Sequence, residues 1–172
     1  KISGWLFCSH PPVIRFNRSN SSARSFTATA DTTAVAGSYD IEVTQLAEAA
    51  KMRSGDFSSG AEVVGAGTLD ITLGADTFQI VVDSNNETLE GVRDSINAAS
   101  DNPGITASII NVDDGIGGSV SRLILSSDQI GDANDISIAV TDDDLNHVDT
   151  TGLSRLATVN LSTLQSAQDS II

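Results

Sequence analysis

The chain has 172 residues, enough for one or two small domains with a hydrophobic core. Its 9 Lys and Arg residues stand against 23 Asp and Glu, a formal net charge of −14. The first 30 residues hold four of the basic residues and no acid, so residues 31–172 carry 5 basic and 23 acidic side chains, a net charge of −18. Such a chain would repel phosphate backbones and anionic membrane surfaces, which argues against nucleic-acid and membrane partners.

The composition is that of a folded, β-rich chain. Hydrophobic residues make up 40% of the sequence and aromatic residues only 4%. With its many small and β-branched residues, this balance favours a compact domain over a disordered acidic chain. No apolar run approaches the length of a membrane span, so we expect no membrane insertion. The single cysteine, Cys8, excludes an internal disulfide framework and a multi-cysteine zinc site.

Residues 1–21 differ in composition from the remainder. Trp5, Cys8 and the pair Pro11-Pro12 crowd into a short stretch of a chain that begins without Met. A charge followed by a short apolar run faintly resembles a signal peptide, but no small-residue cleavage site follows. We interpret residues 1–21 as an atypical segment, either non-native or disordered. We also expect the chain to be a fragment, because it stops at residues 170–172 as a cut strand would.

The first regular patterns are strand-like. Tyr39, Ile41 and Val43 alternate with polar residues, which predicts a half-buried strand. The following residues, 46–52, fit either a short helix or an extension of that strand past a bulge. Alternating runs at 69–73 and 78–82 then predict a β-hairpin, because Gly74-Ala75-Asp76 between them has the length and the glycine of a hairpin loop.

One helix is predicted over residues 88–100. Its apolar residues recur at spacings of three and four and share one face: Leu89, Val92, Ile96 and Ala99. Asn86 or Thr88 can cap the first turn, where acidic side chains suit the helix dipole. The helix is expected to end before Pro103, which cannot continue the hydrogen-bond ladder.

Three more strand-like runs follow at residues 105–112, 122–126 and 136–141, and the tail at 151–168 is weakly helical or a loop. Strands arranged around one helix, without alternation of single strands and helices, predict an α+β fold with a mainly antiparallel sheet.

No constellation in the sequence predicts catalysis. The two histidines, His10 and His147, lie in no triad signature, and no G-x-S-x-G elbow is present. The glycine-rich stretches at 65–67 and 115–118 precede strands and lack the P-loop lysine, so turns are the better interpretation. We therefore expect neither enzymatic activity nor a cofactor.

An acidic loop is the one weak candidate for a metal site. Asp142, Asp144 and Asn146 have the spacing of the first three ligands of an EF-hand loop. The sixth position is His147 rather than Gly, and the twelfth is Leu153 rather than Glu, so the EF-hand match fails. A looser calcium site stays open beside the simpler interpretation, a solvated acidic turn.

Several segments, in order along the chain, resemble one known family. Residues 36–47, with 22–31 before them, resemble the opening of the head region of bacterial flagellar hook-associated protein 2, the filament cap family. Residues 67–108 resemble the flagellin hook IN motif, with Ile96-Asn97 as the name-giving pair. Later landmarks follow in the family's order at 122–134, 151–156 and 167–169.

The resemblance covers residues 22–172, and residues 1–21 depart from it. It singles out eight motif positions: Tyr39, Val43, Gln45, Leu46, Thr88, Leu89, Ile96 and Asn97. Asn97 can serve either as a hydrogen-bonding residue near the helix end, the interpretation we favour, or as a subunit contact. The family's organisation implies one discontinuous domain of about 36–60 and 120–172, with the IN-motif segment of about 61–119 as an inserted domain.

The resemblance also implies a function. It indicates a structural, non-catalytic subunit of the flagellar filament cap, which forms a ring at the filament tip and promotes flagellin polymerisation. The implied partners are further copies of the chain, flagellin, the hook–filament junction proteins and an export chaperone. The implied location is extracellular, on the flagellum, after export by the flagellar type III pathway.

A function of another class stays as the alternative: an extracellular calcium- or glycan-binding adhesin module that uses the acidic loops, overlapping with the cap reading where cap proteins act in adhesion. A glycan-active enzyme is the least favoured interpretation, because 23 acidic residues guarantee chance pairs of carboxylates.

Overall fold

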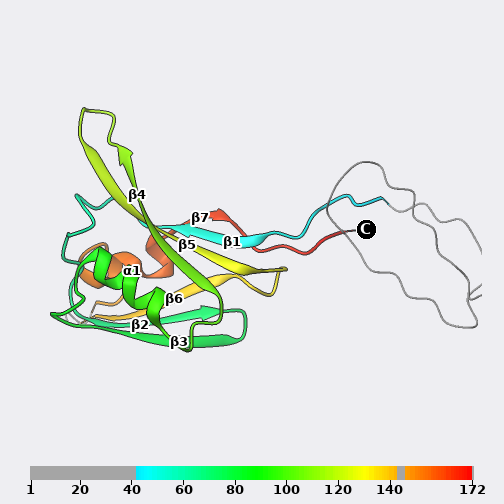
Figure 1. Ribbon diagram of the computed structural model, residues 1–172, viewed down its shortest axis with the longest axis horizontal. Helices are drawn as coiled ribbons and strands as arrows, with labels where there is room; N and C mark the ends of the chain where they lie inside the picture. The colour runs from blue at the N-terminus through cyan, green and yellow to red at the C-terminus, as the bar shows by residue number, and fades with distance from the viewer. Residues whose placement is uncertain (1–41, 143–145, 172) are drawn as a thin grey trace, which may run out of the picture. The chain divides into compact units, whose positions relative to one another are not determined.

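The computed structural model describes residues 42–142 and 146–171, which form two antiparallel sheets and one α-helix (Figure 1). The elements before the long hairpin are β1 (Ala49–Arg53), β2 (Gly67–Leu73), β3 (Asp76–Val82) and α1 (Leu89–Ala98). They are followed by β4 (Ile105–Asp113), β5 (Ser119–Ile130), β6 (Ile136–Asp142), 3-10 turns at Gly152–Leu156 and Thr158–Asn160, and β7 (Ser162–Gln165). The α+β, mainly antiparallel prediction is confirmed.

The two sheets share one hydrophobic core. One sheet has the strand order β4-β5-β1-β7 and the other the order β3-β2-β6. Side chains alternate between a buried inner face and an outer face along most strands, as period-2 patterning requires. The buried side chains of both sheets and of α1 belong to a single cluster. No helix within the described residues has the length and apolar character needed to cross a bilayer.

The β2–β3 hairpin is present and tighter than expected. Asp76 already pairs with Leu73, so the loop has two residues, Gly74 and Ala75, instead of three. Gly74 has a φ of 61°, a left-handed conformation in which glycine is strongly favoured. Alternation along the two strands buries Phe78 and Ile80 on the inner face.

Helix α1 begins where its sequence predicts and ends two residues early. The Thr88 hydroxyl accepts a hydrogen bond from the Gly91 amide at 3.1 Å, which makes Thr88 the N-cap. Three of the four predicted apolar residues are fully buried, Leu89, Val92 and Ile96, and Ala99 is half-buried after the last helical turn. The apolar face therefore fixes the rotation of the helix on the sheets.

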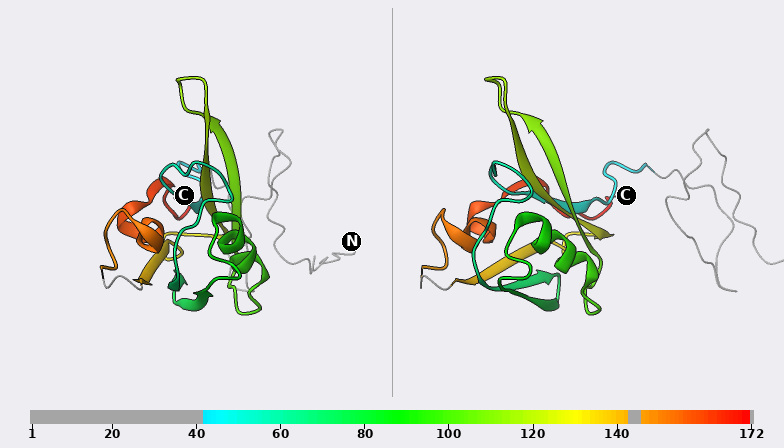
Figure 2. Two further views of the ribbon diagram at one scale, coloured as in Figure 1. Left: turned by 90° about the vertical axis from the view of Figure 1, so that its left-hand side faces the viewer. Right: turned by 60° about the vertical axis from the view of Figure 1, so that its left-hand side comes forward.

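The β4–β5 hairpin projects beyond the rest of the body, as the two rotated views show (Figure 2). Strand β5 is much longer than the predicted run at 122–126, because β4 pairs with its residues 119–127 and β1 pairs with it as far as Ile130. The loop between β4 and β5 ends the projection and carries Ile116, whose side chain is 91% exposed. Sequence periodicity identifies the strand but not its full length, since pairing partners set where a strand ends.

The ambiguous segment at 46–52 resolves as strand. β1 pairs with β5 and β7, and its register against β5 shifts between Ala49 and Lys51, as a bulge produces. The strand predicted near 39–44 falls largely outside the described residues, and residues 42–44 within them form no strand. The tail, predicted as weakly helical or a loop, contains two 3-10 turns, in agreement with that prediction. It also contains the edge strand β7, which the sequence does not predict, because its exposed residues show no alternation that could reveal it.

The division into domains stays a prediction. Strand pairing constrains it, because both sheets join strands from the 61–119 segment with strands from 120–172. Within the described residues, β4 pairs with β5 and β2 pairs with β6. These residues group into one compact unit.

Truncating the buried side of α1 should destabilise the body strongly. Ile96→Ala removes a side chain that is 1% exposed, and the lost burial plus the cavity should lower the free energy of unfolding by about 2–5 kcal/mol. Ile116→Ala removes the same atoms at an exposed position and should change the free energy of unfolding by less than about 0.5 kcal/mol. Urea unfolding of both variants tests this, and equal losses would contradict the assignment of the core.

Candidate functional site

Asn97 fastens the helix to the open edge of β4. Its side-chain amide donates to the Ala107 carbonyl at 2.8 Å, and its amide oxygen accepts from the Ala107 N–H at 2.9 Å. One side chain thus replaces the neighbouring strand that Ala107 lacks, as the satisfaction of edge peptide groups requires. The favoured interpretation of Asn97, a local hydrogen-bonding residue, agrees with this geometry.

Asn102 makes a second connection of the same kind, which the sequence did not reveal. Its amide nitrogen donates to the carbonyls of Ile96, at 2.9 Å, and Ile105, at 2.7 Å. Its oxygen accepts from the amides of Gly104 and Ile105. The helix end and the start of β4 are therefore tied through one amide. The signal that could have indicated it is the Asn-Pro-Gly turn, in which an Asn side chain commonly bonds nearby backbone.

The other described motif positions lie in two parts of the fold, helix α1 and the segment before β1. Thr88, Leu89 and Ile96 belong to the cap and the core of α1 described above. Val43, Gln45 and Leu46 lie on the segment that leads into β1, and Tyr39 lies outside the described residues.

The segment that leads into β1 runs antiparallel to the segment after β7 (Figure 1). Gln45 exchanges backbone hydrogen bonds with Ile171, and its side chain donates to the Asp169 carbonyl at 3.0 Å. Glu48 and Gln168 exchange backbone bonds in the same way. Leu46 is exposed, so this two-stranded connection is held by main-chain pairing without a core of its own.

Asp142 and Asn146, the described residues of the acidic loop, make hydrogen bonds within the chain. Asp142 is 6% exposed, and its carboxylate accepts from the Ser154 amide at 3.0 Å while its own N–H donates to Nδ1 of His147 at 2.9 Å. Asn146 donates to the Asp149 carboxylate at 3.1 Å, and Asp144 lies outside the described residues. Among the residues that are described, no three His, Cys, Asp or Glu side chains group as a metal site would need. A calcium role for Asp142, Asp144 and Asn146 stays a prediction.

Two arginines hold the loop that joins β1 to β2. Arg122 forms an ion pair with Asp56, and Arg155 pairs with Glu62, lies 3.7 Å over the ring of Phe57 and donates to the Asp56 carbonyl. Cation–π contact and bidentate donation suit arginine in particular. These contacts depend on residues far apart in the sequence, so no local pattern indicates them.

These ion pairs shift the titration of both carboxyls. The hydrogen bond from Arg122 holds the pKa of Asp56 below its ordinary value. Burial opposes ionisation of Glu62, but the hydrogen bonds from Arg155 and Ser58 outweigh it and lower the pKa of that carboxyl. Both groups are therefore anionic at neutral pH and hold the loop in its folded position.

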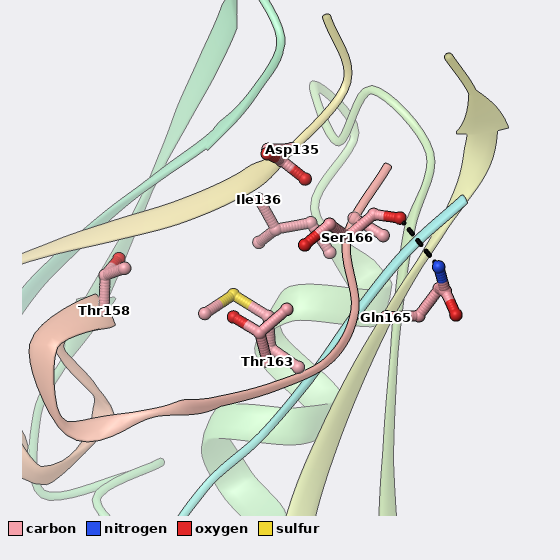
Figure 3. Close-up of a pocket in the computed structure, with 8 residues that line it drawn as sticks. Asp135, Ile136, Thr158, Thr163, Gln165 and Ser166 are labelled. Atoms are coloured by element: carbon pink, nitrogen blue, oxygen red, sulfur yellow. Dashed lines mark hydrogen bonds between the residues drawn. The ribbon is translucent and has the colours of Figure 1, made fainter. Parts of the chain in front are cut away.

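A cavity of about 200 Å³ lies between β1, the start of β6 and β7 (Figure 3). Apolar atoms of Met52 and Ile136 meet polar groups of Thr158 and Asp135 there. Asp135 accepts a hydrogen bond from the Ala167 amide at 2.8 Å and is the sole titratable side chain that lines the cavity. The lining therefore offers no acid–base pair and no nucleophile beside a base.

The outer face of the four-stranded sheet differs in charge from the rest of the chain. We call it the basic face and define it by Lys51, Arg53, Ile110, Val112, Val120, Arg122 and Ile124. These residues point away from the core on adjacent strands, since Arg53 pairs with Ile124 and Ile110 with Arg122. The outer face of the three-stranded sheet carries mainly small polar side chains and one acid, Asp70, which accepts from Gln79 at 2.7 Å.

Comparison with known proteins agrees with the resemblance in the sequence. Residues 13–50 match the model of the flagellar hook-associated protein 2 N-terminus, and residues 68–129 match that of the flagellin hook IN motif. The first match begins at residue 13, earlier than the start near residue 22 that the sequence indicated. The second extends to residue 129 and so includes most of β5.

Similar relatives carry the same description. B-type flagellar hook-associated protein 2 of Pseudomonas aeruginosa is 42% identical over 118 residues, which cover 67% of this chain and 24% of the relative. The polar flagellar hook-associated protein 2 of Vibrio parahaemolyticus is 43% identical over 113 residues, covering 66% of this chain and 16% of the relative. The chain thus spans a quarter or less of the length of these two curated relatives.

Solved structures have the same fold. The crystal structure of FliD (HAP2) from Pseudomonas aeruginosa matches with a TM-score of 0.66 and 35% identity, over 82% of this chain and 64% of that one. The D2-D3 domains of the flagellar cap protein FliD from Escherichia coli match with a TM-score of 0.65 and 30% identity, over 87% of this chain and 76% of that one.

Removing the Asn97 amide should loosen α1 from β4. In Asn97→Ala the Ala107 peptide group loses both partners, so the free energy of unfolding should fall by about 1–3 kcal/mol. Hydrogen exchange at the Ala107 amide should accelerate with it. Ser100→Ala is the control at an exposed position. Unchanged exchange at Ala107 in the Asn97 variant would contradict the role given to this side chain.

Acid should release the loop between β1 and β2. A carboxyl whose pKa is lowered by folding stabilises the fold above its unfolded pKa, near 4, and this stabilisation is lost as the pH falls through the folded value. Stability should therefore decline from about pH 5 downward. The variant Asp56→Asn/Glu62→Gln should be less stable at neutral pH and show a flatter decline. Thermal melts across this range measure both, and parallel curves for the two proteins would refute the assignment.

Proposed function

Because this chain belongs to the family of flagellar hook-associated protein 2, we propose that it is part of the head region of a bacterial flagellar filament cap subunit. Full-length subunits would form a ring at the filament tip and promote the addition of flagellin. The observation that carries the proposal is the joint match in sequence and fold to the D2-D3 domains of a flagellar cap protein, over 76% of that structure.

The geometry supports a mechanical role. Polar side chains of the chain stabilise the fold. Asn97 and Asn102 hold α1 on β4, and Arg122 and Arg155 hold the loop after β1. A body stabilised in this way can present fixed surfaces to neighbouring subunits while it moves as a unit. Assembly at a filament tip needs such surfaces and many weak contacts rather than a reacting group.

The way the body is attached fits the same role. The chain enters and leaves through the paired segments at Gln45 and Ile171, so the body is carried on a two-stranded connection. Main-chain hydrogen bonds without a surrounding core resist extension but bend more readily than a packed layer. The connection therefore suits a head that changes its contacts during assembly.

The proposal extends to partners and location. The partners are further copies of the subunit, flagellin, the hook–filament junction proteins and an export chaperone. The location is the tip of the extracellular flagellum, reached through the flagellar type III pathway, and the action involves no catalysis. The adhesin alternative is not favoured, since the relatives are hook-associated proteins and cap proteins by name.

A strain that lacks its own cap gene provides the test. Expression of the complete gene should restore filaments and swimming, because flagellin would then be retained at the tip. Electron microscopy of filaments and immunoblots for flagellin in the medium measure this, with the empty vector as control. Bald cells that still leak flagellin, despite export of the protein, would show that the proposed function is wrong.

A further inference from the structure

The basic face is an outward-facing, partly exposed surface of unusual composition. Three of the five Lys and Arg residues in 42–171 lie on it, although residues 31–172 have a net charge of −18. The positions of β1, β4 and β5 that share it carry no acidic side chain from 51 to 53, 106 to 112 and 120 to 126. The inner faces of the same strands are buried, whereas no side chain of the basic face is. The loop after β1 reaches this face through Asp56, which pairs with Arg122, and the side chains of the face stay at least partly exposed.

Part of the positive charge on this face is not neutralised internally. Arg122 pairs with Asp56, and the charge of Arg53 also helps to lower the pKa of that carboxyl. Among the described residues, no ion pair includes Lys51. Beside them lie half-exposed β-branched side chains, among which Ile110 is 42% exposed. A face that combines cationic and apolar side chains is suited to binding a surface that is acidic and partly apolar.

The same chain carries a surface of opposite charge along α1. Glu90 and Asp94, four residues apart, lie on the exposed side of the helix, with Asp83, Glu87 and Asp101 at its two ends. Arg93 is the sole cation there and pairs with Asp94. Helix α1 packs against the inner side of the sheets, and the basic face lies on the opposite, outer side of β1, β4 and β5. One subunit therefore presents the two surfaces in different directions.

We propose that the basic face of one copy of this chain binds the acidic surface along α1 of the next copy. A contact between two different surfaces is heterologous, and heterologous contacts close into rings when the rotation between copies allows. Like charges would oppose most other juxtapositions of two such acidic bodies. This inference rests on the proposed function and specifies the contact that its ring would use.

The area of the basic face is too small for a stable interface by itself. Three neighbouring strands about 4.8 Å apart, each contributing about five residues at 3.4 Å, present on the order of 250 Å² per copy. Stable interfaces bury about 1,200 Å² or more in total. The contact therefore acts together with others in the complete subunit, where a closed ring makes each added contact intramolecular. Because its charges are exposed, added salt should weaken it.

The test uses the complete subunit and charge reversal. Lys51→Glu should raise the dissociation constant for self-association about tenfold or more at low salt, measured by analytical ultracentrifugation. Arg93→Glu makes the same change in net charge on the acceptor surface and should leave self-association intact. Ile110→Asp, on another strand of the basic face, should act like Lys51→Glu. Thermal melts establish that each variant is folded.

A charge swap decides between a specific contact and general repulsion. Lys51→Glu/Arg53→Glu should weaken self-association more than Lys51→Glu alone, and adding Glu90→Lys/Asp94→Lys should restore it to within a few-fold of the wild type. Loss without rescue, an equal loss in Arg93→Glu, or no loss at all would each overturn the inference. The proposed function is judged separately, by complementation with the wild-type gene. If the wild type restores filaments and Lys51→Glu self-associates normally, only the contact assigned here is wrong.

Discussion

The peptide groups of β4 that face away from β5 need hydrogen-bond partners, and the way they obtain them positions the rest of the body. Asn97 satisfies Ala107, and Asn102 satisfies Ile105 while holding the carbonyl of Ile96. These bonds fix the helix along the strand edge, so its apolar side enters the space between the sheets. Without them, an edge strand would be left with buried, unpaired polar groups next to the core.

Other edges are closed by the same device. The Thr158 hydroxyl bonds both the N–H and the C=O of Ile138 on the outer edge of β6, and His147 accepts from the Asp142 amide further along that strand. Single side chains thus stand where further strands would otherwise pair. Such closure limits edge-to-edge association, one of the hazards of open sheets. At β4 and β6, the outer faces of the sheets rather than these closed edges are therefore the surfaces available to partners.

The few cationic side chains and the many carboxylates of the chain have different uses. Arg122 and Arg155 are used within the molecule, on the loop after β1, and most carboxylates have no cation to pair with. Such a net negative charge opposes the approach of two copies of the chain except where a positive surface meets a negative one. The basic face is where the charge changes sign.

The sequence by itself determined the elements whose signals are local. Helix α1, with Thr88 at its start, and the β2–β3 hairpin around Gly74 follow from periodicity and turn chemistry within some fifteen residues. The family resemblance also rested on such short segments. Only the tertiary structure decided the rest. Strand β7 exists because β1 pairs with it, and Arg155 reaches Phe57 across the fold. The basic face exists because strand register places Lys51, Arg53 and Arg122 on one side, a relation between strands that no single stretch of sequence contains.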